Sequence, residues 1–231
     1  DGGGNFIKIF GAVSPDYLNC NATVYCNTDE NRECFLCMTD IEYGEKNIFE
    51  IGSEEDLKTI NSKLPKIYEL KCDIVLSENW EPIEFYGDLE GNGYTISNLN
   101  VISDQEYSYD YAGLFSTNYG TIRDLNVETN ESGVLSLRGS TATAGIIAGS
   151  NEGTIENCTA AGVVEGLKSA GGIAGNNGGV IDGCYAAAVM ENSYSYQGGL
   201  IGCNFGTVTN SHALSNIKAS SYLGGLIGRS S

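Results

Sequence analysis

The chain has 231 residues, of which 30 are Asp or Glu, 12 are Lys or Arg and one is His, so its formal net charge is −18. This acidic balance argues against nucleic acid as a partner, because phosphate binding needs a basic face. The sequence contains no run of about 18 apolar residues, so we expect no membrane insertion. A single histidine excludes a His-Glu-x-x-His zinc site.

Residues 1–47 are predicted to form an acidic, cysteine-rich segment that differs from the rest of the chain. Residues 1–110 carry 22 acids and 7 bases, a net of −15, whereas residues 111–231 carry 8 acids and 5 bases, a net of −3. Four cysteines lie close together, at Cys20, Cys26, Cys34 and Cys37. Two disulfides are favoured for an extracellular protein. A zinc site and free thiols remain alternatives, because the last two cysteines have zinc-knuckle spacing.

A capping helix is predicted next, over residues 53–64, after a short strand that begins at Ile48 and opens the unit 48–231. Ser53 suits an N-cap, and acids fill the first turn. Apolar residues follow at spacings of three and four, at Leu57, Ile60 and Leu64. Such a helix would cover the open end of a repeat fold, which otherwise exposes unpaired backbone. The alternating stretch 68–76 is predicted as the first strand of the repeats.

A glycine-rich motif then recurs every 26 or 27 residues, within repeats that we place at about 89–231. The copies are the runs 144–149, 170–175, 198–202 and 224–228, which align through Gly145, Gly171, Gly198 and Gly224. Apolar residues alternate with polar or small ones over short runs, which is a strand period, and glycine pairs leave no room for helices. A repeat of this length indicates a solenoid. We therefore predict an all-β, right-handed parallel β-helix of about five to six rungs, with glycines at positive-φ corners.

Aligned repeats predict columns of like residues stacked from rung to rung. An asparagine column can chain its side-chain amides, as in cross-β ladders, and two apolar columns are expected to pack inside. Cys158 and Cys184 share one of these and are predicted to be buried free thiols, because parallel Cβ directions disfavour a bridge. The columns are Asn92, Asn118, Asn151, Asn177 and Asn204; Ile96, Ile122, Ile155, Ile181 and Val208; and Leu99, Leu125, Cys158, Cys184 and Ser211.

These repeats resemble a known family. Gly-Gly-Leu-Ile-Gly together with Asn-x-Gly-Thr-Ile is similar to the GLUG-motif repeat of bacterial surface proteins, and residues 80–99 resemble the entry segment of those proteins, with Glu90 where Asp is usual. The resemblance covers roughly residues 48–231. It implies a secreted or surface-anchored, adhesin-like protein, or a noncatalytic segment of an IgA-specific metallopeptidase. It carries over no catalytic residue, because the motif has none.

The favoured function is an adhesin-like module for a host glycan or protein, without catalysis and without a cofactor. A rigid coil displays side chains at fixed spacing, and tyrosines offer flat, amphipathic contact area, although tyrosines also simply favour strands. Tyr196 and Tyr222 are predicted to share a column with Asp110 and Ser169. The candidate ligand contacts are Tyr107, Tyr109, Tyr111, Tyr194, Tyr196 and Tyr222.

Two other functions stay open: a noncatalytic stalk of a larger secreted protein such as a peptidase, and a polysaccharide-active enzyme. One outer strip is predicted to stack three charged residues, Arg123, Glu156 and Asp182. We interpret it as a solvent-exposed surface and not as a catalytic or Ca²⁺ site. His212 is expected in the core or on the rung surface. The Gly-rich start suits a tether behind a signal or a lipidated cysteine, and further repeats or a partner are expected over the last rung.

Overall fold

The computed structural model describes residues 48–60, 66–77, 79–102, 110–136, 142–193, 196–219 and 222–230. The chain divides into two units, residues 1–48 and 49–231, and the second is a parallel β-helix. The predicted cysteine cluster lies outside the described residues, as do three of the candidate tyrosines: Cys20, Cys26, Cys34, Cys37, Tyr107, Tyr109 and Tyr194.

Four parallel sheets form the walls of the coil. Sheet A contains β1 (Ile48–Ile51), β2 (Ile67–Leu70), β5 (Asp88–Glu90), β9 (Thr121–Arg123), β13 (Thr154–Glu156), β17 (Val180–Asp182) and β21 (Thr207–Thr209). Sheet B contains β3 (Ile74–Val75), β6 (Thr95–Ile102), β10 (Asn126–Ser136), β14 (Thr159–Gly166), β18 (Tyr185–Ser193), β22 (His212–Ala213) and β23 (Asn216–Ala219). Sheet D contains β7 (Tyr111–Ala112), β11 (Thr143–Gly145), β15 (Ser169–Gly171), β19 (Tyr196–Gly198) and β24 (Leu223–Gly224). Sheet C contains β4 (Ile83–Phe85), β8 (Phe115–Asn118), β12 (Ala148–Asn151), β16 (Ala174–Asn177), β20 (Ile201–Asn204) and β25 (Ile227–Ser230).

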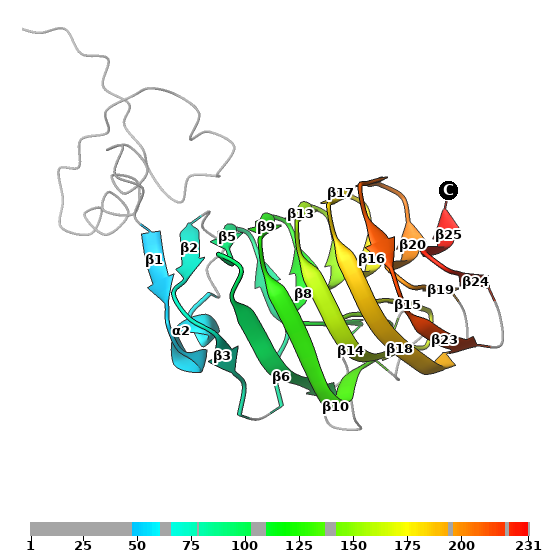
Figure 1. The fold of residues 1–231 in the computed structure, drawn as a ribbon, viewed down its shortest axis with the longest axis horizontal. Coiled ribbons are helices and arrows are strands. Elements are labelled where there is room, and N and C mark those ends of the chain that lie inside the picture. The colour runs from blue at the N-terminus through cyan, green and yellow to red at the C-terminus, as the bar shows by residue number, and fades with distance from the viewer. Residues whose placement is uncertain are drawn as a thin grey trace, which may run out of the picture. The chain divides into compact units, whose positions relative to one another are not determined.

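Each rung visits the sheets in the order A, B, D, C and then climbs to the next rung. Among the described residues, five rungs have a strand in every sheet, and they begin at β5, β9, β13, β17 and β21. A partial rung of β2, β3 and β4 precedes them. Figure 1 shows the strands of successive rungs side by side, from cyan to red. The predicted parallel β-helix of five to six rungs is confirmed.

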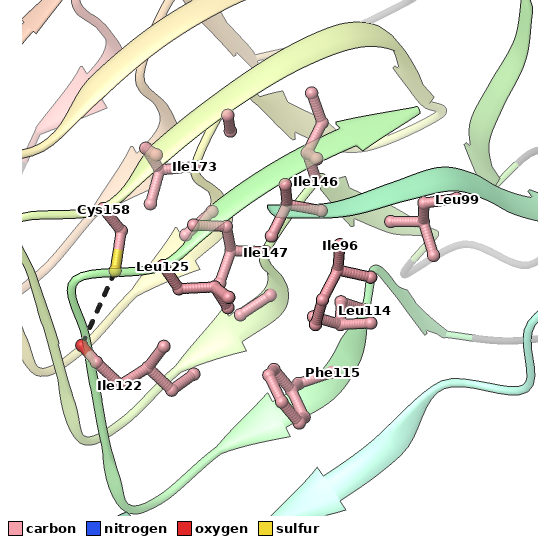
Figure 2. Packing of buried hydrophobic residues seen from close by; sticks show 14 of the residues in the cluster. Ile96, Leu99, Leu114, Phe115, Ile122, Leu125, Ile146, Ile147, Cys158 and Ile173 are labelled. Carbon is pink, nitrogen blue, oxygen red and sulfur yellow. Dashed lines mark hydrogen bonds between the residues drawn. The ribbon is translucent and has the colours of Figure 1, made fainter. Parts of the chain in front are cut away.

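Inward-facing aliphatic residues stack into a continuous core. In sheet A the register places Leu89, Ile122, Ile155 and Ile181 over one another, and all four are fully buried. Figure 2 shows Ile96, Leu114, Phe115, Ile146 and Ile147 packed in the same interior. Because each rung supplies the same column positions, these aliphatic side chains contact like residues in the neighbouring rungs.

The predicted asparagine ladder is present over four rungs of sheet C. The Asn118 side-chain amide donates to Asn151 Oδ1 at 2.7 Å, Asn151 donates to Asn177 at 2.8 Å, and Asn177 donates to Asn204 at 2.7 Å. Each Nδ2 group also lies near the carbonyl oxygen two residues onward, at 3.0 to 3.4 Å. The ladder therefore provides hydrogen-bond partners for the buried side-chain amides along the coil axis.

The predicted register of the first rung was wrong. Phe85, not Asn92, pairs with Asn118, and Asn92 lies in a turn where its amide donates to the Leu70 carbonyl. Ile96 pairs with Val127 and Leu99 with Thr129 in sheet B, so neither belongs to its predicted column. The similarity between residues 95–101 and 121–127 compares one sheet B strand, β6, with a segment that holds all of β9 in sheet A, a corner and the start of β10 in sheet B. Both segments alternate, so periodicity alone could not separate them.

The stretch 68–76 is also not one strand. It is β2 in sheet A and β3 in sheet B, separated by a corner at residues 71–73. Asp73 accepts the backbone N–H of Thr95 at this corner.

The corners between sheets A and B contain a residue with positive φ, in the left-handed region of the backbone map, but in most of them this residue is not glycine. Asp124, Asn157 and Asn210 have φ near +50°, as does Asn92 in the first complete rung, and the glycines with positive φ in these corners are Gly93 and Gly183. Asn and Asp tolerate this conformation because their short polar side chains bond locally. The prediction of glycine corners was therefore wrong for most of these turns, and the repeated glycines have another role.

That role is close packing of sheets C and D, whose strands in the middle rungs are buried on both faces. A Cβ at Gly175 would overlap the Thr143 methyl group, and a Cβ at Gly202 would overlap Ser169 Oγ. Ser169 Oγ also donates to the Gly175 carbonyl at 2.7 Å. Small Thr and Ser side chains of sheet D therefore fill spaces that glycines leave in sheet C. We call this contact, made by Thr143 and Ser169 of sheet D with Gly175 and Gly202 of sheet C, the C/D seam. Because it has room for small side chains, a larger side chain in the same column of sheet D has to extend to the surface.

A short helix, α2 (Glu54–Lys58), lies beside the first strands, as predicted, but it is shorter than residues 53–64. Ser53 is its N-cap and accepts the Asp56 N–H at 3.1 Å. Leu57 is fully buried, and Ile60 is buried just beyond the helix. Residues 61–64 lie outside the described residues.

Candidate ligand-binding surface

Three candidate tyrosines fall in one column of sheet D. The register pairs Tyr111 with Thr143, Thr143 with Ser169, and Ser169 with Tyr196. Tyr222 continues the column, because its neighbour Leu223 pairs with Gln197. The column therefore holds Tyr111, and the predicted placement of Asp110 in it was wrong by one residue.

The C/D seam explains which members of this column reach the surface. Thr143 and Ser169 are fully buried in the seam, whereas Tyr111 is 36% and Tyr222 66% exposed. The Tyr111 Cβ already lies at the seam, 2.7 Å from where a Cβ of Gly149 would be. A tyrosine is too long for the space that a serine fills, so its ring must extend outward. Two buried rungs separate Tyr111 from the other two tyrosines, and the structure does not bring all three together.

Tyr196 and Tyr222 form an aromatic pair with an arginine beside it, which we call the tyrosine–arginine cluster (Tyr196, Tyr222 and Arg229). The two ring centroids are 5.1 Å apart, with an interplanar angle of 34°. The Arg229 guanidinium lies 5.1 Å from the Tyr196 centroid and donates to the Tyr196 hydroxyl at 3.3 Å. Cation–π contact of this kind holds both groups in place. Sequence reasoning identified the tyrosines and missed Arg229, which reaches them from sheet C.

A second exposed aromatic pair was not predicted. Tyr86 and Tyr119 stack with centroids 4.8 Å apart and an interplanar angle of 16°. Tyr119 is 48% exposed. Burial, and then a hydrogen bond to Glu84, raises the pKa of Tyr86. The sequence signal for this pair was a Tyr-Gly dipeptide at residues 86–87 and again at residues 119–120. In later rungs the tyrosine position is held by Glu152 and, two rungs further on, by Phe205.

The predicted charged strip on sheet A is confirmed by the register, which pairs Glu156 with Arg123 and with Asp182. Arg123 and Glu156 form an exposed ion pair at 4.0 Å. Hydrogen bonds from Thr209 Oγ1 and then Asn210 Nδ2 lower the pKa of Asp182. These carboxylates are thus occupied by partners on the solvent face. Across the described part of the chain, no group of three or more His, Cys, Asp or Glu residues is arranged to hold a metal ion.

His212 is exposed on sheet B, where it pairs with Tyr185 and its ring lies 4.8 Å from the tyrosine ring. Of its two predicted places, the structure selects the rung surface. Within the described residues, no helix has the length and apolar character needed to cross a membrane.

The two thiols of the sheet A–B corner column are buried and unbridged, as predicted. Cys158 donates to the carbonyls of Glu156 and Ile122, the latter drawn in Figure 2, and Cys184 donates to Asp182 and Ile155. Hydrogen bonding with Cys184, and then burial, raises the pKa of the Cys158 thiol well above its usual range.

We expect iodoacetamide at about pH 8 to alkylate Cys72 in the folded protein and to spare Cys158 and Cys184, because alkylation needs an accessible thiolate and Cys72 is the exposed one among the four cysteines in the described residues. Peptide mapping by mass spectrometry separates these sites from the other cysteines. All sites should react in denaturant. Modification of Cys158 as fast as Cys72 in the native protein would contradict the packing of this column.

Comparison with known proteins gives one sequence relative and one solved structure. No family model matches the chain. It is 36% identical over 198 residues to halomucin of Haloquadratum walsbyi, a match that covers 71% of this chain and 2% of halomucin. The crystal structure of a Bacteroides ovatus protein, with a proposed assignment as immunoglobulin A1 protease, is similar with a TM-score of 0.63 at 21% identity. That match covers 81% of this chain and 63% of the other, so the chain spans less than two thirds of either protein. At this identity the structural match shows a shared fold.

Proposed function

We propose that this chain is an extracellular, noncatalytic binding module of the GLUG-repeat type, which uses the tyrosine–arginine cluster to hold a glycan. One observation carries the proposal: Tyr196 and Tyr222 present paired rings on consecutive rungs, 5.1 Å apart, with Arg229 against them. Exposed aromatic pairs on a rigid scaffold lose little entropy on binding. The match to a segment of halomucin, a mucin by name, supports the extracellular part of the proposal.

The rigidity of the scaffold supports the same proposal. The asparagine ladder and the C/D seam order the strands around the cluster: Tyr196 in β19 pairs with Ser169 of the seam, Arg229 in β25 pairs with Cys203, and Tyr222 immediately precedes β24. A site on strands is held more precisely than one on loops. The ligand would meet a preformed surface and would not need to order it.

The test is binding of the purified chain to a glycan and host-glycoprotein array, for the native protein and a Tyr196→Ala/Tyr222→Ala variant. We expect saturable binding that weakens by roughly 30-fold in the variant, since aromatic hot spots contribute about 2 kcal/mol. Tyr119→Ala is the matched control, because it removes an exposed stacked tyrosine from another corner. Equal binding by all three proteins would exclude the cluster as the site.

A spacer is the second candidate function. It is favoured by the small part of halomucin that the chain matches, 2% of its length, since one repeat segment of a very long chain can serve only to extend it. It predicts no saturable ligand. An array without signal, from protein that keeps its β-sheet circular dichroism, would select the spacer.

A further inference from the structure

Charge is unevenly distributed along the sequence, and the tyrosine–arginine cluster comes from a segment without Asp or Glu. Residues 192–231 contain no Asp or Glu, yet they include Lys218 and Arg229, in a chain whose formal net charge is −18. Asp182 of the preceding rung accepts hydrogen bonds from Thr209 and Asn210 on sheet A, whereas the cluster is built from sheets C and D. The segment of chain that carries the cluster therefore contributes two cations and no carboxylate side chain.

Arg229 is available to an anion. Among the described residues its guanidinium has one hydrogen-bond acceptor, the Tyr196 hydroxyl, and no carboxylate within ion-pairing distance. Guanidinium carries five donors in a planar fork that matches a carboxylate, so one bond to Tyr196 leaves the fork able to bind a second acceptor. Contact with the Tyr196 ring orients that fork.

A second cation belongs to the neighbouring rung. Lys168 is exposed, and its backbone carbonyl accepts the Tyr196 N–H at 3.0 Å. The described residues provide no carboxylate partner for its ammonium group. Arg229 is thus the cation in contact with the Tyr196 ring, and Lys168 adds an exposed cation to the segment that is hydrogen-bonded to Tyr196.

We infer that the ligand of this cluster is an acidic sugar, a uronic or sialic acid, with its carboxylate on the Arg229 guanidinium and its ring against Tyr222. This inference rests on the proposed function and names the class of glycan. A sugar ring presents C–H groups to the exposed Tyr222 face, while its carboxylate makes charge-assisted, bidentate hydrogen bonds with arginine. A neutral sugar would leave the fork of Arg229 without an anionic partner.

The experiment uses two pairs of acidic and neutral ligands: oligogalacturonate and its methyl ester, which differ mainly in charge, and sialyllactose and lactose, which differ by one sialic acid residue. Titration calorimetry should show binding of at least one acidic probe, at least 10-fold tighter than its neutral counterpart and weakened by added salt. Arg229→Gln should lose about 10- to 100-fold in affinity for the acidic probe, since hydrogen bonds to charged groups contribute about 1.5–3 kcal/mol. Arg229→Lys should recover part of the loss, because lysine lacks the planar fork.

Arg123→Gln is the matched control, because it removes an exposed arginine that already pairs with Glu156 on sheet A. Its affinity should stay unchanged. The inference is overturned if neither acidic probe binds, if the neutral probes bind as tightly, or if polyglutamate competes as well as the acidic sugar. If neutral glycans bind and the tyrosine double variant loses them while Arg229→Gln does not, the proposed function stands and the acidic-sugar inference fails.

Discussion

Gly171→Ala is expected to destabilise the coil by about 3 kcal/mol or more, at the upper end of what overpacking costs. A Cβ at this position would overlap the Ala174 carbonyl oxygen and lie 2.7 Å from both Gly202 N and Ile201 Cα. All three atoms are backbone atoms of the C/D seam, so no side chain can rotate away to make room. Chemical denaturation followed by circular dichroism measures the free energy of unfolding.

Gly225→Ala is the matched control for this prediction. Gly225 belongs to the last copy of the same motif, its φ is not positive, and nothing lies within 4 Å of an added Cβ. The substitution should be neutral or stabilise the fold by about 0.4–1 kcal/mol, because alanine restricts the unfolded chain. Equal destabilisation by both substitutions would mean that chain flexibility, and not the seam, is what the repeated glycines provide.

Asn151→Ala is expected to cost about 3 kcal/mol, because one substitution interrupts the asparagine ladder on both sides. Asn151 accepts from Asn118 at 2.7 Å and donates to Asn177 at 2.8 Å, and all three side chains are fully buried. Each buried polar group left without its partner costs about 1–3 kcal/mol. The change in the denaturation midpoint at constant slope measures the effect.

Asn204→Ala at the end of the ladder is the comparison. Asn204 accepts from Asn177 and donates to the Gly206 carbonyl, and its next neighbour in the column is Ser230. Only one ladder bond is lost, so we expect roughly half the cost of Asn151→Ala. If the two substitutions cost the same, the ladder does not act through its neighbours and each amide stabilises only its own turn.

The proposed function depends on the same two sets of contacts, because both keep the scaffold rigid. A glycan site on strands needs the seam and the ladder to keep the rings of Tyr196 and Tyr222 at their spacing. A variant that loosens the seam at Gly202, where a Cβ would overlap Ser169 Oγ, should therefore weaken binding without touching the ligand.

The parallel β-helix and the asparagine ladder could be predicted from the sequence, because an Asn-x-Gly motif marks the same corner in successive rungs. Asn118, Asn151, Asn177 and Asn204 bond in the predicted order for this reason, although they are 33, 26 and 27 residues apart. The predicted register was wrong where this motif is absent, in the rung that holds Phe85 at the asparagine position. Asn92 and Ile96 were placed with the wrong partners because alternation reveals a strand and does not say which of four sheets it joins.

Contacts between different columns were decided by the tertiary structure alone. The sequence placed Tyr196 and Tyr222 together, but Arg229 meets them only because sheets C and D turn back on each other at the glycine seam. Tyr86 and Tyr119, by contrast, share a column because Phe85 pairs with Asn118, and they were missed because the predicted register placed Asn92 beside Asn118. The repeat period determines which residues lie above and below a given residue in its column. The residues beside it, in another sheet, depend on how tightly the chain bends at each corner. That bend is set by the size of the side chains that fit between neighbouring strands.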